Sequence, residues 1–354
     1  MLHSKAPGKL ILLGEYAVLR GAPALVMAVN RHAHVYLQPS PNGHIVITAP
    51  DVGLKEVLLS LQDDNTLRFI RATPAEMQQA KFLKAALETV ANHYPMSPVA
   101  LTISTAEFFY ENTTTKLGLG SSAAVTVATI AALLQFIQKS KAEKDAFKFQ
   151  IMEMALAAHR RAQGKQGSGV DIAASTFGGM LTYRMPVVPT QMPPEIVQVK
   201  QPDTLFMRFV WTGRAASTTQ LVQQVQHFRE QNPTRFNQLM GELIYLAEQG
   251  SAAFQRGDVQ AFLEIVQEYF TILKELSEAS GAPIISPEHQ QIAEVARKHQ
   301  VAYKPSGAGE GDFGILFSEN EHWLIDATGD LQKFNFIVYP FKPDIIGVNI
   351  ERGE

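Results

Sequence analysis

A glycine-rich turn that runs directly into an apolar segment is the stretch of this 354-residue chain whose residue types point most clearly to chemistry. It reads Lys116-Leu-Gly-Leu-Gly-Ser-Ser-Ala-Ala-Val-Thr-Val-Ala-Thr-Ile130. Gly118 and Gly120 allow the backbone a positive φ and a close approach to a ligand. Ser121 to Ala123 would begin a helix, whose free N–H groups and dipole attract anions. The stretch therefore predicts a phosphate-binding turn.

The same residues leave a second interpretation open. The turn is not the usual P-loop, because no Lys-Ser or Lys-Thr pair closes it and the nearby lysine, Lys116, precedes the glycines. A helix start capped by serines is common and requires no ligand. Other parts of the chain must decide between the two.

Two more glycine-rich turns follow in the chain. The first, Gly164-Lys-Gln-Gly-Ser-Gly-Val-Asp171, leads into a short apolar segment, and the second, Ser306-Gly-Ala-Gly-Glu-Gly-Asp-Phe-Gly314, leads into Ile-Leu-Phe. The latter formally matches the dinucleotide fingerprint. That fingerprint belongs to a turn between a strand and a helix, whereas here the glycines precede a strand, so we reject a dinucleotide site.

Composition limits the classes of function. With 46% hydrophobic and 18% charged residues, the chain can bury a sizeable core and is expected to form two domains. The net charge of −3 argues against nucleic acid or an anionic membrane as the main partner. The absence of cysteine excludes disulfides, thiolate metal sites and cysteine nucleophiles. The first residues lack the pattern of a signal peptide, and we expect a cytoplasmic protein.

The pattern of apolar residues predicts an α+β chain. Strands are expected at 9–16, 24–29, 34–38, 44–48, 66–72, 99–104, 180–184, 204–212 and 334–340, and at the start of the segment after the third turn. Helices are expected at 73–94, from 121, and at about 143–163, 217–231, 235–255, 258–280 and 287–299. The proline-rich stretch 185–194 is the candidate boundary between domains.

The three turns, in this order, resemble the GHMP small-molecule kinase family when the early stretch Ala6-Pro-Gly-Lys-Leu-Ile-Leu-Leu-Gly-Glu-Tyr-Ala-Val18 is added. Within the family, the segment from His159 to Asp171, Lys116 and the stretch Trp211-Thr-Gly-Arg-Ala-Ala-Ser-Thr218 are most similar to the phosphomevalonate kinases. The resemblance implies a two-domain GHMP kinase fold. An S5-like ATP-binding domain would span residues 1–185, a ferredoxin-like domain would span 195–354, and the active site would lie between them.

The resemblance further implies ATP-dependent phosphorylation of (R)-5-phosphomevalonate to (R)-5-diphosphomevalonate. The cofactors would be ATP and Mg²⁺, the partners small molecules, and the chain a monomer or homodimer. Lys9 would neutralise charge between the acceptor and the γ-phosphate while pairing with Asp171. Because the acceptor is already an anionic phosphate, Asp171 would orient it rather than abstract a proton.

The remaining site residues are carried over from the same resemblance. The ATP phosphates would be held by Lys116, Gly118, Leu119, Gly120, Ser121, Ser122 and Ala123, and the Ser122 hydroxyl would also contact Mg²⁺, which prefers oxygen ligands. An acceptor with a carboxylate and a phosphate needs cations and N–H donors. The candidates are Lys165, Ser168, Gly169, Arg214, Ser217, Thr218, Gly307, Ala308 and Gly309, followed by Arg160, Arg161 and Lys304.

Three departures from the family pattern keep alternatives open. Arg160 stands where mevalonate kinases place a metal-binding glutamate, Glu310 where glycine is usual, and Phe313 where cysteine is frequent. A mevalonate kinase or another small-molecule GHMP kinase, a diphosphomevalonate decarboxylase and a catalytically silent GHMP-fold regulator therefore remain alternatives.

Three histidines are candidates for metal binding or for acid–base chemistry. His32 and His34 share one face of an expected strand, but no third ligand is evident, so we do not expect a metal there. His159 is expected to be a hydrogen-bonded, partly buried histidine.

Overall fold

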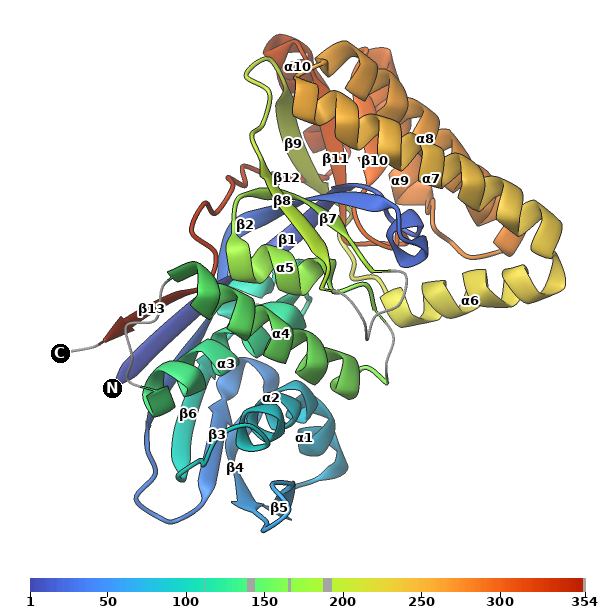
Figure 1. The fold of residues 1–354 in the computed structure, drawn as a ribbon. Helices are drawn as coiled ribbons and strands as arrows, with labels where there is room; N and C mark the ends of the chain where they lie inside the picture. Colours follow the sequence, from blue (N-terminus) through green and yellow to red (C-terminus); the bar gives the residue numbers. More distant parts are fainter. Residues whose placement is uncertain (112, 139–143, 165–166, 187–192, 353–354) are drawn as a thin grey trace.

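The computed structural model describes residues 1–111, 113–138, 144–164, 167–186 and 193–352. Its larger sheet follows the strand order β13-β1-β2-β6-β3-β4-β5, with β7 paired to β2 and β8 to β7 (Figure 1). Its strands are β1 (Leu2–Leu13), β2 (Pro23–Pro39), β3 (Ile45–Ala49), β4 (Leu54–Leu61), β5 (Leu67–Arg71), β6 (Val99–Ser104), β7 (Met180–Arg184), β8 (Glu195–Val199) and β13 (Asn349–Arg352). The pairing of β3 with β6 is parallel and the others are antiparallel.

Strand β2 corrects one sequence prediction. Two strands were expected at 24–29 and 34–38, but a single strand of 17 residues runs through both. Its first half pairs with β7 and its second half with β6, so the polar stretch at its centre stays within one strand. The strands β4, β8 and β13 were not predicted.

Five helices cover this sheet: α1 (Pro74–Gln79), α2 (Lys81–Ala91), α3 (Ser121–Gln138), α4 (Lys144–Ala162) and α5 (Val170–Phe177). The single helix expected at 73–94 is therefore two helices, separated at Ala80. Helix α3 is long and apolar enough to span a membrane by length and composition alone. It packs against β1, β2, α2, α4 and α5, with residues 123–134 buried, and is thus the central core helix of this layer.

The smaller sheet is antiparallel and has the order β10-β11-β9-β12. Its strands are β9 (Phe206–Trp211), β10 (Ala302–Pro305), β11 (Phe313–Ser318) and β12 (Ile337–Tyr339). The helices of this part are α6 (Thr218–Gln231), α7 (Pro233–Arg256), α8 (Val259–Ser280), α9 (Pro287–Lys298) and α10 (Glu321–Lys333), of which α10 was not predicted. Short 3₁₀ turns lie at Ala17–Arg20, Pro50–Val52 and Ala106–Phe108.

The two sheets are connected by close packing rather than by a linker alone. Helix α7 packs on α8 and on the ends of β1 and β2. At Gly250 a Cβ atom would lie 2.3 Å from Leu13 Cδ2, so this helix approaches β1 through a position without a side chain. Strands β8 and β13 both follow the expected domain boundary, yet both join the larger sheet. The division at 1–185 and 195–354 stays a prediction, and residues 187–192 lie outside the described part.

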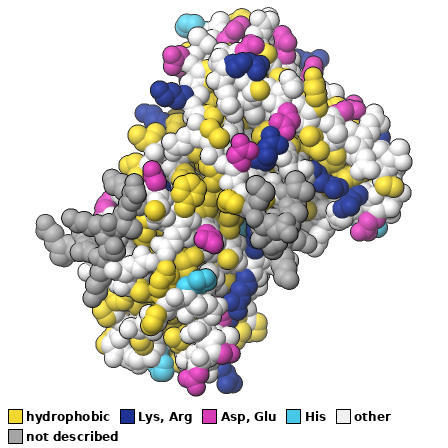
Figure 2. All heavy atoms as spheres, in the orientation of Figure 1, with side chains coloured by type: hydrophobic (Ala, Val, Ile, Leu, Met, Phe, Trp, Pro, Cys, Tyr) yellow, Lys and Arg dark blue, Asp and Glu magenta, His cyan; other side chains and the backbone are white. Residues whose placement is uncertain are grey.

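Charged side chains of both signs are scattered over the face of the molecule drawn in Figure 2. Acidic and basic side chains alternate over the face drawn in Figure 2, on the part with the larger sheet and on the part with α7 and α8. An anionic ligand of this protein must therefore be bound by local donors rather than by a broad field.

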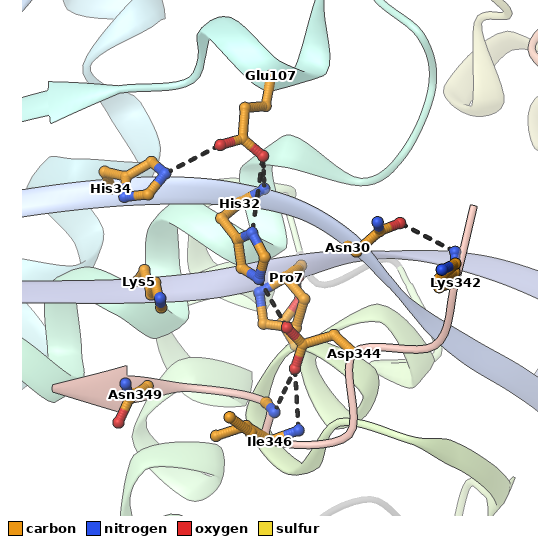
Figure 3. Close-up of polar contacts among 12 residues, drawn as sticks. Lys5, Pro7, Asn30, His32, His34, Glu107, Lys342, Asp344, Ile346 and Asn349 are labelled. Atoms are coloured by element: carbon orange, nitrogen blue, oxygen red, sulfur yellow. Dashed lines mark hydrogen bonds and ion pairs between the residues drawn. The ribbon is translucent and has the colours of Figure 1, made fainter. Parts of the chain in front are cut away.

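The segment that leads to β13 is bound to the larger sheet by a cluster of charged groups (Figure 3). The Asp344 carboxylate bonds His32 Nε2 at 2.7 Å and accepts the N–H groups of Ile346 and Gly347. Glu107 accepts the backbone N–H of His32 and bonds the His34 ring. His32 and His34 thus share a face, as expected, and contact carboxylates. No group of three potential metal ligands occurs among the described residues.

The ionisation of this cluster is set by its ion pairs. Burial lowers the pKa of His32, but the hydrogen bonds and charges of Asp344 and Glu107 outweigh it and raise that pKa to about 9. Burial likewise raises the pKa of Glu107, and the bonds from His32 outweigh it and lower it to about 2. The stabilisation from His32 is complete below its unfolded pKa of about 6.5 and is lost as the pH rises through about 9.

We predict that Asp344→Asn lowers the free energy of unfolding by about 2 kcal/mol at pH 6, because a charge-assisted hydrogen bond is lost. The loss should be smaller at pH 10, where His32 is neutral in both states. Urea unfolding at the two pH values measures it, with the exposed Asp63→Asn as control. An equal loss at both pH values would contradict the ionic account.

Candidate active site

The central glycine-rich turn, which we call the phosphate loop (residues 116–122), is held in place by its own apolar residues. Leu117 and Leu119 are buried. Gly118 and Gly120 both have φ of +77°, a conformation that favours glycine. Helix α3 begins at Ser121, within the phosphate loop, so the first N–H groups of that helix have no acceptor one turn earlier in the helix. The predicted turn-to-helix arrangement is confirmed.

The phosphate loop lies directly against β1. The backbone N–H of Lys9 donates to the carbonyl of Leu119 at 2.8 Å. A Cβ atom on Gly8 would lie 2.6 Å from that same carbonyl oxygen, so the residue before Lys9 must be small. The early Pro-Gly-Lys motif thus places Lys9 at the loop.

Lys9 and Asp171 meet beside Gly120. A Cβ atom on Gly120 would lie 3.2 Å from Lys9 Cε and 3.9 Å from Asp171 Cβ. Lys9 therefore takes up space that a side chain at position 120 would need, and Asp171 lies at van der Waals distance from that space. Among the described residues no ion pair joins Lys9 to Asp171, so the pairing expected from the sequence is not observed. The structure brings together the two residues for which the sequence predicts a catalytic role.

The second glycine-rich turn positions Asp171 as the second residue of α5. Gly169 precedes the helix with φ of +85°, and Asp171 Oδ1 accepts the N–H of Ile172 at 3.0 Å. The helix is bonded to β1, because Ser175 Oγ donates to the Pro7 carbonyl at 2.7 Å. The carbonyl of Ser168 accepts the Tyr183 hydroxyl at 2.5 Å, which holds the turn itself.

Ser122 has a hydrogen-bond partner that the sequence did not indicate. Its Oγ lies 3.2 Å from His159 Nε2, and the His159 ring stacks on Phe82. His159 is buried, so it is the hydrogen-bonded histidine that was expected. It fixes the hydroxyl at the start of α3, and Ser122 retains oxygen lone pairs for a second contact.

The third glycine-rich turn (residues 306–312, called the third loop) is attached to the end of β1 by a buried ion pair. Lys304 Nζ donates to Glu15 Oε1, which also accepts the N–H of Gly307 at 3.2 Å. Tyr16 Oη donates to the carbonyl of Ala308 at 2.6 Å. Burial raises the pKa of Glu15 and lowers that of Lys304, while their mutual attraction acts in the opposite direction in each.

Lys304 is therefore not an acceptor-binding cation, which corrects that prediction from the sequence. Its side chain is fully buried and committed to Glu15. A second buried group supports the same loop: His289 bonds the Tyr303 hydroxyl at 2.7 Å and the Gly311 carbonyl at 3.1 Å. Burial lowers the pKa of His289 to about 4, so the ring is neutral at pH 7.

The segment between β9 and α6 (the 212–217 loop) lies against the third loop. The N–H of Ala216 donates to Asp312 Oδ1, and the N–H of Ser217 donates to Glu310 Oε2, both at 3.0 Å. The Glu310 side chain thus lies toward the start of α6. Its carboxylate is hydrogen-bonded to the N–H of Ser217, a donor of the predicted acceptor site. Asp312 was overlooked in the sequence, although an acidic residue within a glycine-rich turn was a visible signal.

The predicted cations are distributed unevenly. Arg214 lies on the 212–217 loop but pairs with Glu288 at 2.6 Å, and Arg161 pairs with Glu88 at 3.0 Å. Lys116 is exposed at the start of the phosphate loop. Lys165 lies outside the described residues. Arg214 could bind an anionic acceptor only if its ion pair with Glu288 were broken.

A cavity of about 720 Å³ lies between α6, the end of α8 and the third loop. Glu310 lines it together with Leu221 and a set of polar residues from α6 and the end of α8: Gln220, Gln223, Gln224, His227 and Ser280. Lys9 and Asp171 do not line it, so its size alone does not mark the reacting centre.

We predict that Lys304→Met lowers the free energy of unfolding by about 3–5 kcal/mol, because it leaves the Glu15 carboxylate buried without a cation. The double variant Lys304→Met with Glu15→Gln should recover much of that loss. Denaturant unfolding of the two single variants and the double variant measures the coupling. Additive losses would show that the two side chains do not act as a pair.

Comparison with known proteins agrees with this geometry. Residues 81–179 match the family model described as GHMP kinases N terminal domain. The chain is 30% identical to a phosphomevalonate kinase of a Streptomyces species over 89% of both chains. It is 29% identical to a mevalonate kinase of Archaeoglobus fulgidus over 98% of this chain and 99% of that one.

Solved structures give the same result for the fold. A Listeria innocua protein has a TM-score of 0.86 at 26% identity and 99% coverage of both chains. Streptococcus pneumoniae phosphomevalonate kinase, solved with phosphomevalonate and AMPPNP, has a TM-score of 0.77 at 20% identity, covering 97% of this chain and 100% of that one. The α+β GHMP kinase fold that the motifs predict is confirmed, and the chain belongs to the GHMP kinase family.

Proposed function

We propose that this protein transfers the γ-phosphoryl group of ATP to the phosphate of (R)-5-phosphomevalonate and forms (R)-5-diphosphomevalonate and ADP. The observation that carries the proposal is the placement of Lys9 and Asp171 beside Gly120, on the phosphate loop. The relatives are kinases named for mevalonate or phosphomevalonate. A cytoplasmic monomer or homodimer is part of the same proposal.

The phosphate loop binds the nucleotide. The N–H groups of Gly120, Ser121 and Ser122, at the start of α3, would donate to the β- and γ-phosphates, which the helix dipole also favours. Mg²⁺ binds proteins through few oxygen ligands and keeps waters and phosphate oxygens. The Ser122 hydroxyl fits that requirement and would hold the ion, which reduces the negative charge on the phosphates.

Lys9 and Asp171 act on the reacting groups. A phosphate oxygen of the acceptor forms a bond to the γ-phosphorus as the bond to the bridging oxygen of ATP breaks, and ADP leaves with that oxygen. Lys9 stabilises the negative charge shared by the donor and the acceptor. Asp171 orients the acceptor and holds the Lys9 ammonium, and because the acceptor phosphate is already ionised, no strong base is required.

The acceptor binds between the second and third glycine-rich turns and the 212–217 loop. Its anionic groups are met by Arg214, Lys165 and the donors at Ser168, Gly169, Ser217, Thr218 and 307–309. Mevalonate kinase activity is the second candidate, because the relative from Archaeoglobus fulgidus matches almost the full length at nearly the same identity. The two candidates differ in whether the acceptor needs its own phosphate.

We predict that with ATP and Mg²⁺ the value of kcat/KM for (R)-5-phosphomevalonate exceeds that for mevalonate by at least about a hundredfold, since two charge-assisted contacts are lost without the phosphate. Coupled ADP release with each acceptor measures it. Turnover restricted to mevalonate would replace the proposed substrate with the second candidate, and released CO₂ would indicate the decarboxylase alternative.

We predict that Lys9→Met and Asp171→Asn each lower kcat by about 10²–10³, because each removes charge stabilisation or orientation at the reacting atoms. The melting temperature should change little, since both side chains are only partly buried. Matched controls are Lys5→Met, on the same strand, and Asp326→Asn, on the exposed face of α10. Unchanged kcat in both site variants would exclude this centre.

A further inference from the structure

Asp312 ends the third loop and has no part in the proposal above. Its φ is +57°, in the left-handed region, which a residue other than glycine enters at a cost. A conformation of this kind persists where the surrounding contacts fix it. The contacts of Asp312 reach two other loops of the site.

The first contact is with the phosphate loop. A Cβ atom on Gly118 would lie 2.0 Å from Asp312 Cγ, 2.2 Å from Oδ1 and 2.3 Å from Oδ2. The carboxylate therefore fills the space that any side chain on Gly118 would need. The third loop and the phosphate loop are in direct contact at this point.

The second contact is with the 212–217 loop, to which Asp312 forms several hydrogen bonds. Asp312 Oδ1 accepts the N–H of Ala216 at 3.0 Å. The Asp312 carbonyl accepts the N–H and the hydroxyl of Thr212, both at 3.0 Å, and the Asp312 N–H donates to the Arg214 carbonyl at 2.8 Å. The loop that carries Arg214 and Ser217 is thus fixed to Asp312 at both of its ends.

We propose that Asp312 is a positioning residue that fixes the acceptor-binding 212–217 loop against the phosphate loop, so that the acceptor is presented to the γ-phosphate. The inference rests on the proposed function for the roles of the two loops. Asp312 acts through Ala216, Thr212 and Gly118 and transfers no proton. The pair of Gly118 and Asp312 is required together, because only glycine leaves room for the carboxylate.

The charge of Asp312 determines how strongly it holds Ala216. The charged groups that face it are Lys9 from β1 and Glu310 from its own loop, and the 212–217 loop contributes the N–H of Ala216. Burial raises the pKa of Asp312 to about 6, and Glu310 adds to the rise, while Ala216 and Lys9 oppose it. Protonation below about pH 6 leaves a neutral carboxyl, which is a weaker acceptor for the Ala216 N–H.

The test uses Asp312→Ala and Asp312→Asn in the full chain. Asp312→Ala should raise the acceptor KM at least about tenfold and change the ATP KM little, because the lost hydrogen bond to a charged group belongs to the 212–217 loop. The acceptor phosphate itself takes up a proton near pH 6 in every variant, so the quantity compared is the acceptor KM of wild type divided by that of Asp312→Asn, which has no titrating group at this position. That ratio should show a rise below about pH 6. Glu310→Gln, on the same loop, should keep that rise.

Hydrogen–deuterium exchange of residues 212–217 separates this inference from the proposed function. Exchange in this segment should be faster in Asp312→Ala than in wild type. This result does not depend on which acceptor the protein uses, or on whether it turns over phosphomevalonate or mevalonate at all. Asp312→Asn, which can still accept a hydrogen bond, serves if the alanine variant does not fold. Unchanged exchange together with an unchanged acceptor KM would overturn the inference. An acid dependence of the acceptor KM that is as steep in Asp312→Asn as in wild type would also overturn it.

Discussion

The close approach of side chains to the backbone of the phosphate loop is the constraint on which the rest of the site depends. Gly120 leaves room for Lys9 and Asp171, and Gly118 leaves room for Asp312. These acidic and basic groups come from β1, α5 and the third loop, which are far apart in sequence. Positively and negatively charged groups therefore lie around the N–H donors of the loop. Binding and transferring a phosphoryl group requires such an arrangement.

The elements that supply those groups are bonded to one another away from the loop. Ser175 of α5 bonds the backbone of β1 just before Lys9, and the buried pair of Glu15 and Lys304 connects the end of β1 to the third loop. His32 and Asp344 attach the chain after β12 to the larger sheet. Because the first two of these contacts involve strand β1 or the residues just after it, Lys9 is held to the second and third loops through backbone and buried contacts rather than through surface charges alone.

Local sequence patterns predicted the central turn and two helix starts. Glycines followed by serines and an apolar run predicted the turn and the start of α3, and Thr73 with Glu76 predicted a helix start whose capping box is present. Local patterns did not predict the single strand β2, because its polar centre reads as a break. They also missed β13, since a short edge strand is defined by its partner rather than by its own residues.

The roles of single charged residues were harder to predict. Lys304 was expected among the acceptor-binding cations, and only the fold brings it to Glu15, far away in the chain. Glu310 stands where the family usually has glycine, and its orientation toward Ser217 depends on where α6 begins. Asp312 is marked in the sequence only as an acidic residue within a glycine-rich turn, and its role depends on contacts with two other loops that the fold brings to it.

The most direct measurement for the account is a crystal structure of the protein with AMPPNP, Mg²⁺ and (R)-5-phosphomevalonate. The account predicts that the terminal phosphate of the nucleotide lies at the start of α3 within hydrogen-bond distance of Lys9 Nζ, with the acceptor phosphate between it and Asp171. A nucleotide phosphate chain bound away from residues 116–122, or an acceptor bound in the cavity beside α6 out of reach of Lys9, would contradict it.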